Sequence, residues 1–319
     1  MKKICILTPV KNEELNIESF VKSVADHVSA IEGYTFEHIL IDNFSEDLSR
    51  DIIRRSVKKY PHLGAIFNLR DFGVPRSQLY ALQKMDADAV VLISADFQEP
   101  IELIKEFVLE WEMGNLIVGG VKESSEENIV LYFLRRLYYA ILHSISEVKP
   151  LKGYMGFALY DKEVISELKK IKDRNPYVRA IPTDLGYSIK TIPYHQPLRK
   201  KGNSKASLFV LFEMAINGIT SYSKAPMRIA SILGFIASLG CFLIGITYFI
   251  YKLLNWNEFQ VGIAPLIILI SFGFSIQILL IGLIGEYVAK INTEVVARPL
   301  VIEKERVNFP VKEPINLKK

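Results

Sequence analysis

The chain has 319 residues, half of them hydrophobic, and its mean hydropathy of +0.21 is high for a purely soluble protein. Its formal net charge of +4 is too small for an extended nucleic-acid surface, so we expect no nucleic-acid partner. The two cysteines, Cys5 and Cys241, fall in a predicted strand and in a long apolar segment. We therefore expect no disulfide, and the composition does not require an oxidising compartment.

Short apolar runs alternate with helical patterns through the first part of the chain. Strands are predicted at residues 4–7, 38–41, 64–68, 89–93 and 116–120, and helices at 15–24, 49–60, a stretch ending at 85 and one opening at Pro100. This alternation predicts a parallel sheet with helices on both faces. Further on, we expect a helix over 129–148, strands within 152–160 and 188–193, and a basic loop at 199–205.

Small and polar residues follow the strand predicted at 89–93. They include Ser94, Asp96 and Gln98. In open α/β sheets ligands bind beyond the carboxyl ends of the strands, and a carboxylate there can hold a divalent cation against a diphosphate. The alternative is that Asp96 caps the helix that begins near Ile101. This stretch alone leaves both interpretations open.

Two later segments are long enough to cross about 30 Å of hydrocarbon, and neither carries a charge over 229–251 or 261–285. Basic residues precede the first segment and follow the second, whereas only Lys252 lies in the connection. We expect a membrane hairpin with both termini in the cytoplasm, and two buried core helices are the alternative. Residues 206–223 are expected to form an interfacial helix, with a core helix as the alternative. The tail from residue 297 is expected to be extended or partly disordered.

The ordered motifs resemble those of family 2 glycosyltransferases. Residues 8–14 resemble the family's P-V-Y-N-E-E, 41–47 its V-D-D-G-S-x-D, 70–73 its R-N-F-G and 96–100 the end of D-A-D-L-Q-D-P. Residues 199–205 fit R-x-x-G-x-S-K, and 285–287 and 297–299 fit G-E-Y and A-R-P. The likeness covers nearly the whole chain. It is strongest to polyprenyl-phosphate glycosyltransferases with two membrane helices, which include undecaprenyl-phosphate glucosyl and aminoarabinosyl transferases and dolichyl-phosphate mannose synthases.

The resemblance implies an α/β fold of the GT-A type, with a Rossmann-like, mostly parallel sheet. It implies a GT-A domain over 1–205, an interfacial helix and linker over 206–228, a transmembrane hairpin over 229–290 with spans of about 229–251 and 261–287, and a cytoplasmic tail over 291–319. The expected reaction moves a sugar from a UDP- or GDP-sugar to a polyprenyl phosphate, such as undecaprenyl phosphate, with inversion. The expected cofactor is Mg²⁺ or Mn²⁺. The expected location is the cytoplasmic face of a bacterial inner membrane, with homo-oligomers, tetramers by resemblance.

The candidate site residues fall into three groups, of which the first two are carried over from the family. The nucleotide-sugar group is Thr8, Pro9, Glu13, Asp42, Asn43, Arg70, Ser94, Asp96, Lys122 and Ser204. Asp96 and Gln98 are the expected metal ligands, and with Arg199 and Lys205 they form the expected catalytic set. The acceptor-phosphate candidates are Arg135, Arg136, Lys152 and Lys201. The alternative for Arg135 and Arg136 is a pair facing solvent or lipid headgroups, and for Lys122 a surface lysine.

Several positions depart from the family pattern. Ser94 replaces the first metal-site aspartate, Asn43 stands where the family often has Asp, and Phe44 where it usually has Gly. Gly156 and Ala158 replace the Asp and Arg of G-D-F-R-L. A phosphate monoester, whose second pKa is roughly 6, is mostly a dianion at neutral pH and needs no strong base.

Two other functions are alternatives to sugar transfer to a lipid. One is a non-catalytic relative that binds nucleotide or lipid and scaffolds a cell-envelope glycan pathway, which the departures at Ser94, Gly156 and Ala158 favour. The retained Asp96, Gln98 and the basic loop at 199–205 count against it. The other is a polymerising synthase, against which the two spans and the missing Q-x-x-R-W signal count.

Overall fold

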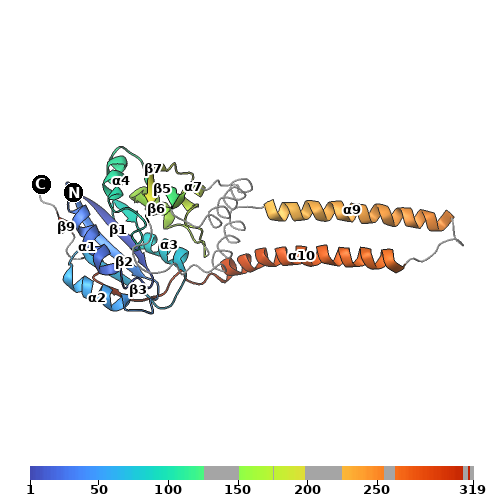
Figure 1. Cartoon of the computed structure of the whole chain (residues 1–319), viewed down its shortest axis with the longest axis horizontal. Helices are drawn as coiled ribbons and strands as arrows, with labels where there is room; N and C mark the ends of the chain where they lie inside the picture. Colours follow the sequence, from blue (N-terminus) through green and yellow to red (C-terminus); the bar gives the residue numbers. More distant parts are fainter. Residues whose placement is uncertain (126–150, 175, 198–224, 255–262, 312–314, 317–319) are drawn as a thin grey trace.

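The computed structural model describes residues 1–125, 151–174, 176–197, 225–254, 263–311 and 315–316 (Figure 1). A globular α/β part holds most of these residues, and two long helices project from it side by side (Figure 1). The predictions for 129–148, for the basic loop at 199–205 and for the interfacial helix at 206–223 lie outside the described residues.

A mixed, mostly parallel sheet forms the centre of the globular part. Its first four strands are β1 (Lys2–Val10), β2 (Tyr34–Asp42), β3 (Leu63–Asn68) and β4 (Ala89–Leu92), all parallel in the order β4-β1-β2-β3. The sheet continues from β4 through β6 (Tyr154–Asp161), which is antiparallel to β4, to β5 (Ile117–Ser125) and β7 (Lys190–Gln196). The predicted mostly parallel α/β sheet is confirmed.

Helices cover both faces of this sheet. One face packs against α1 (Ile17–Val28), α2 (Ser49–Lys59) and α4 (Leu103–Glu112), and the other against α3 (Val74–Lys84), α6 (Lys162–Leu168) and α7 (Ile181–Asp184). Side chains of β1 alternate between the two cores, with Ile4 and Ile6 in the first and Cys5 and Leu7 in the second. Because successive side chains of a strand point to opposite faces, a strand that is buried on both reads as one continuous apolar run.

The C-terminal tail returns to the sheet. Strand β8 (Glu303–Val307) pairs antiparallel with the edge of β3, and β9 (Ile315–Asn316) pairs antiparallel with β2. Leu300 and Val301 are buried just before β8. Arg54 on α2 forms an ion pair with Glu305, so side chains add to the backbone pairing. The tail, expected to be extended or partly disordered, is extended at β8 and β9.

The two long helices are α9 (Ala225–Leu254) and α10 (Ile263–Val296). Their segments Met227–Tyr251 and Phe272–Val296 have mean hydropathies of 2.4 and 1.7, and none of the residues in their most apolar windows is buried. Both helices are apolar all round, and both are long and apolar enough to cross a membrane. At 1.5 Å per residue α10 is about 50 Å long, so it exceeds the hydrocarbon thickness and reaches the globular part. There the backbone N–H of Arg174 donates to Glu294 Oε1 at 3.0 Å.

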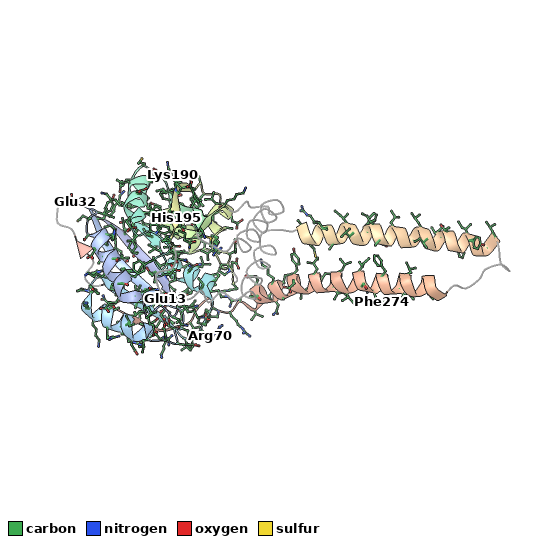
Figure 2. The ribbon with its side chains drawn as sticks, in the orientation of Figure 1. Glu13, Glu32, Arg70, Lys190, His195 and Phe274 are labelled. Atoms are coloured by element: carbon green, nitrogen blue, oxygen red, sulfur yellow. The ribbon has the colours of Figure 1, made fainter. Side chains whose placement is uncertain are left out.

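The carboxyl ends of the parallel strands face the side of the helices. Figure 2 places Glu32, which precedes β2, at the end of the globular part farthest from the helices, and Arg70, which follows β3, nearer to them. Parallel strands end at the same edge of a sheet, so the loops after β1, β2, β3 and β4 gather there. This edge carries the candidate site.

Candidate active site

The loops after β1 and β2 are joined to each other by hydrogen bonds. The backbone N–H groups of Asn12 and Glu13 donate to the hydroxyls of Ser45 and Ser49, each at 2.8 Å. In return, the N–H of Glu46 donates to Asn12 Oδ1 at 2.7 Å. These bonds fix the loops after β1 and β2 against each other, and we call the surface that they form the wall of the site. Glu13 lies within it, and its carboxylate accepts a bond from the Asn16 amide at 2.8 Å.

Thr8 and Pro9 lie near the end of β1. Thr8 is fully buried, and its hydroxyl lies 3.0 Å from Nε2 of His38 on the neighbouring strand. Pro9 is half-buried beside it. The structure therefore places Thr8 in the sheet interior, with its hydroxyl already engaged by His38.

Asp42 ends β2 as a completely buried carboxylate. It accepts a bond from Arg50 Nε at 2.7 Å, and the N–H of Ser45 lies 3.2 Å from both of its oxygens. The guanidinium of Arg50 also donates to the carbonyl of Asn68 at 2.9 Å. Asp42 thus ties α2 and β3 to the loop after β2. The sequence offered no sign that Arg50 belongs to this edge.

The side-chain amide of Asn43 joins the loops after β2 and β3. Its Nδ2 donates to Asp71 Oδ1 at 2.7 Å, while its Oδ1 accepts from Asn68 Nδ2 at 3.0 Å and from the N–H of Phe72 at 3.1 Å. Asp71 also forms an ion pair with Lys11 from the β1 loop. Asn43 therefore holds the wall together through its amide. Asp71, absent from the predicted site set, lies beside it.

Arg70 is exposed at the rim of the site, as Figure 2 shows. Its guanidinium lies 4.0 Å from the centre of the Phe72 ring and donates to the carbonyl of Asp71 at 2.8 Å. A guanidinium held at the rim by an aromatic face can meet an anionic ligand without being buried. The expected contact of Arg70 with the diphosphate stays a prediction.

The loop after β4 closes on itself. The carboxylate of Glu99 accepts a bond from the backbone N–H of Ser94 at 2.6 Å, and Asp96 Oδ1 accepts one from the N–H of Gln98 at 3.2 Å. Between them, Phe97 has a positive φ of 58° and packs its ring edge-to-face against Phe20 of α1. Asp96 and Gln98 are half-buried. The loop thus holds Ser94, Asp96 and Gln98 together at the same edge as Asp42.

Glu99 itself is buried beneath this loop. Burial raises the pKa of its carboxyl to about 8, with a smaller contribution in the same direction from Asp96, while the N–H of Ser94 and the charge of Arg179 oppose the shift. Burial raises the pKa values of three tyrosines, Tyr154, Tyr160 and Tyr194, and the charge of Glu99 adds to each of these shifts. Sequence reasoning missed Glu99 as a member of the site.

Two lysines lie on the other side of Asp96 from Asp42. Lys122 is half-buried at the end of β5, and its backbone N–H donates to the carbonyl of Gly153 at 3.0 Å, beside the exposed Lys152. Both lie at the carboxyl edge because β5 runs parallel to β4. The structure therefore brings these two predicted residues together. Arg135, Arg136, Arg199, Lys201, Ser204 and Lys205 lie outside the described residues.

Residues 5–172 match the sequence family described as "Glycosyl transferase family 2". The chain belongs to glycosyltransferase family 2. The family predicted from the motifs is therefore confirmed, and so is the prediction that the protein is a glycosyltransferase enzyme.

Relatives of this family 2 glycosyltransferase match over nearly their full length. The SfII prophage-derived bactoprenol glucosyl transferase of Shigella flexneri is 30% identical over 305 residues, covering 95% of this chain and 98% of that protein. The uncharacterized glycosyltransferase YkcC of Bacillus subtilis is 29% identical over 301 residues, covering 93% and 92%. Among solved structures, glucosyl-3-phosphoglycerate synthase from Mycobacterium tuberculosis, in complex with Mn²⁺, uridine diphosphate and phosphoglyceric acid, has a TM-score of 0.45 and 16% identity, covering 69% and 76%.

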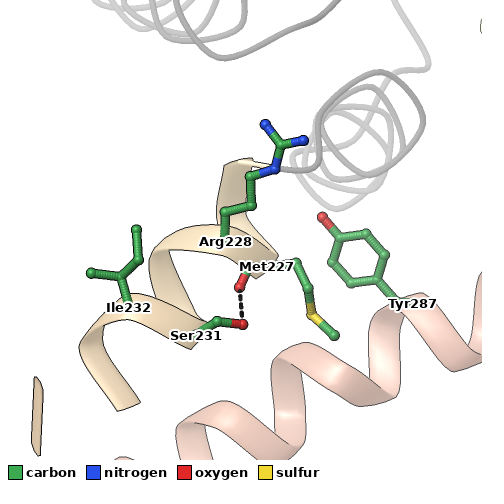
Figure 3. A pocket seen from close by; sticks show the side chains of 5 residues that line it. All are labelled: Met227, Arg228, Ser231, Ile232 and Tyr287. Carbon is green, nitrogen blue, oxygen red and sulfur yellow. Dashed lines mark hydrogen bonds between the residues drawn. The ribbon is translucent and has the colours of Figure 1, made fainter. Parts of the chain in front are cut away.

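A cavity of about 530 Å³ lies between the two long helices of this glycosyltransferase, close to the globular part (Figure 3). Met227, Ile232 and Ser231 of α9 line it, with Arg228 and Tyr287 from the two helices. The Ser231 hydroxyl donates to the carbonyl of Met227 at 2.9 Å, which leaves a largely apolar wall. A cationic group beside an apolar cavity suits a lipid that carries an anionic head.

We expect Glu99 to make the stability of this glycosyltransferase fall as pH rises. Folded Glu99 keeps its proton up to about pH 8, whereas an unfolded glutamate releases it near ~4.3. Between these values the unfolded state binds fewer protons, so folding weakens by up to about 1.4 kcal/mol per pH unit. Glu99→Gln cannot ionise. Its thermal midpoint should therefore exceed the wild-type midpoint at pH 8 and approach it at pH 5.

The matched control for this series is Glu106→Gln, an exposed position on α4. Thermal unfolding of the detergent-solubilised proteins from pH 5 to pH 8.5 gives the comparison. A constant offset between wild type and Glu99→Gln across that range would contradict the prediction, because only an ionising group makes the offset grow with pH.

Proposed function

We propose that this protein transfers a sugar, with inversion, from a UDP- or GDP-sugar to a polyprenyl phosphate at the cytoplasmic face of a bacterial inner membrane. One observation carries the proposal. The Asp96 loop and the wall built on Asp42 share the carboxyl edge of the sheet, on the side of two helices that are long and apolar enough to cross a membrane. A relative that matches 95% of the chain is named a bactoprenol glucosyl transferase, which supports a polyprenyl acceptor.

The residues at this edge fit a divalent cation that the substrate helps to hold. The described residues contain no group of three or more His, Cys, Asp or Glu side chains that could hold a metal ion. Mg²⁺ usually keeps several waters and binds one or two carboxylates beside substrate phosphates, so Asp96 with the amide of Gln98 matches that need. Asp96 and Gln98 would hold Mg²⁺ or Mn²⁺. When bound, the ion offsets the negative charge of the departing nucleoside diphosphate.

The chemistry needs positioning and charge compensation more than a general base. An oxygen of the acceptor phosphate attacks the anomeric carbon, and the bond from that carbon to the nucleoside diphosphate breaks. Because the phosphate is mostly a dianion at neutral pH, no residue has to take a proton from it. Lys122 and Lys152 can orient the acceptor phosphate. The substitutions at Gly156 and Ala158 are compatible with this reaction.

The long helices are assigned to the acceptor. Their spans would hold the isoprenoid chain in the bilayer, and the cavity beside Arg228 would receive the part nearest the phosphate. This arrangement would place the globular part at the membrane surface. The division of the chain into a GT-A domain, an interfacial helix, a hairpin and a tail, and its assembly into tetramers, stay predictions.

The test uses the purified full chain in detergent micelles with undecaprenyl phosphate. A panel of radiolabelled UDP- and GDP-sugars, UDP-glucose first, is offered with Mg²⁺ or Mn²⁺. The expected result is a lipid-linked sugar whose formation needs the lipid phosphate. Failure to form one from every donor, while a relative with known activity succeeds in the same assay, would overturn the proposal and favour a scaffolding role.

A further inference from the structure

Phe44 adopts a backbone conformation that side chains rarely take. Its φ is +64°, and it follows Asn43 at the point where β2 reaches the candidate site. The left-handed region is unfavourable for a residue with a side chain, and most of all for a bulky one. Such strain persists where the surroundings impose it, and it concentrates at ligand-binding sites. Here the neighbours Asn43 and Ser45 are both buried and bonded, which fixes the backbone at Phe44.

The ring of Phe44 is supported on one face by a cation. The guanidinium of Arg50 lies 4.8 Å from the ring centre, and bonds to Asp42 and to the carbonyl of Asn68 hold it there. A guanidinium that makes two such bonds has little freedom to move. The ring therefore rests on a rigid base, with its plane fixed relative to the sheet.

Packing in the protein interior does not account for this ring. Neither of the two hydrophobic cores defined by the described residues includes Phe44, although both include partly buried aromatic side chains. Phe44 is itself only partly buried. A strained, partly exposed aromatic ring outside both cores gains little from the hydrophobic effect in the folded chain. A planar ligand stacked on the ring would account for its position.

The carboxylates beside the ring are each paired with a cation of the protein, Asp42 with Arg50 and Asp71 with Lys11, and Arg70 lies next to Asp71. Asp42 and Asp71 lie beside the Phe44 loop, whereas Lys122 and Lys152 lie on the far side of β4. In the strand order, β2 is two strands from β4, or about 10 Å. A donor whose diphosphate lies at Asp96 would thus extend its nucleoside toward Phe44 and its sugar toward the lysines.

We infer that Phe44 is the stacking platform for the nucleobase of the donor, sandwiched between the base and Arg50. The inference rests on the proposed function, and it adds a binding residue that the predicted site set lacks. Stacking on an aromatic ring strengthens the binding of a base and tolerates different bases. Phe44 therefore sets the affinity for the nucleoside, and the diphosphate is bound elsewhere.

The first experiment measures binding by calorimetry with the full-length protein and Mn²⁺, using UDP, GDP and inorganic pyrophosphate as probes. Phe44→Leu keeps an apolar side chain but removes the aromatic face, and is expected to weaken nucleotide binding about tenfold. Phe44→Tyr keeps the ring and should bind within about threefold of wild type. The affinity for pyrophosphate should be the same in all three proteins.

Two further variants separate binding from folding. Phe44→Gly relieves the backbone strain, so its thermal midpoint should equal or exceed that of Phe44→Leu while its nucleotide affinity is equally weak. Phe44→Trp places an indole at the platform. Its fluorescence should change on addition of UDP or GDP but not of pyrophosphate, measured against the wild-type signal from Trp111 and Trp256.

Each outcome decides the matter. Equal nucleotide binding by wild type and Phe44→Leu overturns the inference and leaves the proposed function standing. A matching loss of pyrophosphate affinity also overturns it, because the defect would then lie in the phosphate site. A wild-type protein that binds neither nucleotide overturns both the inference and the proposed function.

Discussion

Replacing Asp96 with asparagine is expected to lower the rate of sugar transfer about a hundredfold or more. Asparagine has the same shape and still offers an oxygen to the N–H of Gln98, so the loop after β4 should keep its fold. What it lacks is the negative charge that would hold a cation against the diphosphate. Initial rates over a range of Mn²⁺ concentrations, together with the Mn²⁺ dependence of UDP binding, measure the effect.

The control for this variant is Asp86→Asn. Asp86 is exposed and precedes β4, so it lies at the opposite edge of the sheet. It should transfer sugar at the wild-type rate. If Asp96→Asn does so as well, Asp96 does not hold the cation, and its place at the strand end reflects only the turn that it makes with Gln98.

Replacing Asp42 with alanine is expected to destabilise the protein by about 3 kcal/mol or more. The carboxylate is completely buried, and its loss leaves the largely buried guanidinium of Arg50 without its charge partner. The loop that contains Ser45 loses its acceptor as well. Thermal denaturation in detergent should show a midpoint lower by about 6 °C or more.

A second substitution tests the cause of that loss. Asp42→Ala combined with Arg50→Met removes both charges and should recover part of the stability, because no unpaired charge stays buried. Asp51→Ala on the same helix provides the surface comparison. Its ion pair with Arg54 spans 3.7 Å and is mostly exposed, so its removal should cost less than about 1 kcal/mol. Equal effects at positions 42 and 51 would contradict the assignment of Asp42 as a buried support.

The strands of the central sheet could be predicted because buried strands appear in the sequence as short apolar runs between turn residues. The run predicted at 89–93 is β4 at Ala89–Leu92, and the one at 64–68 is β3 at Leu63–Asn68. Strand β8 carries no such signal, because its residues are mostly charged and it lies at the edge of the sheet. Its stability depends on backbone pairing with β3 and on Arg54, which lies far away in the chain.

The candidate site was predictable to the extent that each residue follows a strand. Asp42, Asp96 and Arg70 lie at the carboxyl edge for that reason alone. The use made of Asn43 could not be predicted, because its partners Asn68 and Asp71 depend on the register between β2 and β3. Glu99 was missed for a related reason. It interacts electrostatically with Tyr194, which β7 contributes from much later in the sequence.

The position of β8 has a consequence for biosynthesis. Strand β8, which completes the edge beside β3, is made after both long helices. During translation one side of β3 therefore stays unpaired until β8 is made. At a synthesis rate of about 5–20 residues per second this delay exceeds about ten seconds. Until β8 is made, the chain carries an open strand edge together with two uncovered apolar helices, which favours aggregation. Pairing of β8 with β3 therefore comes only after both apolar helices have been made.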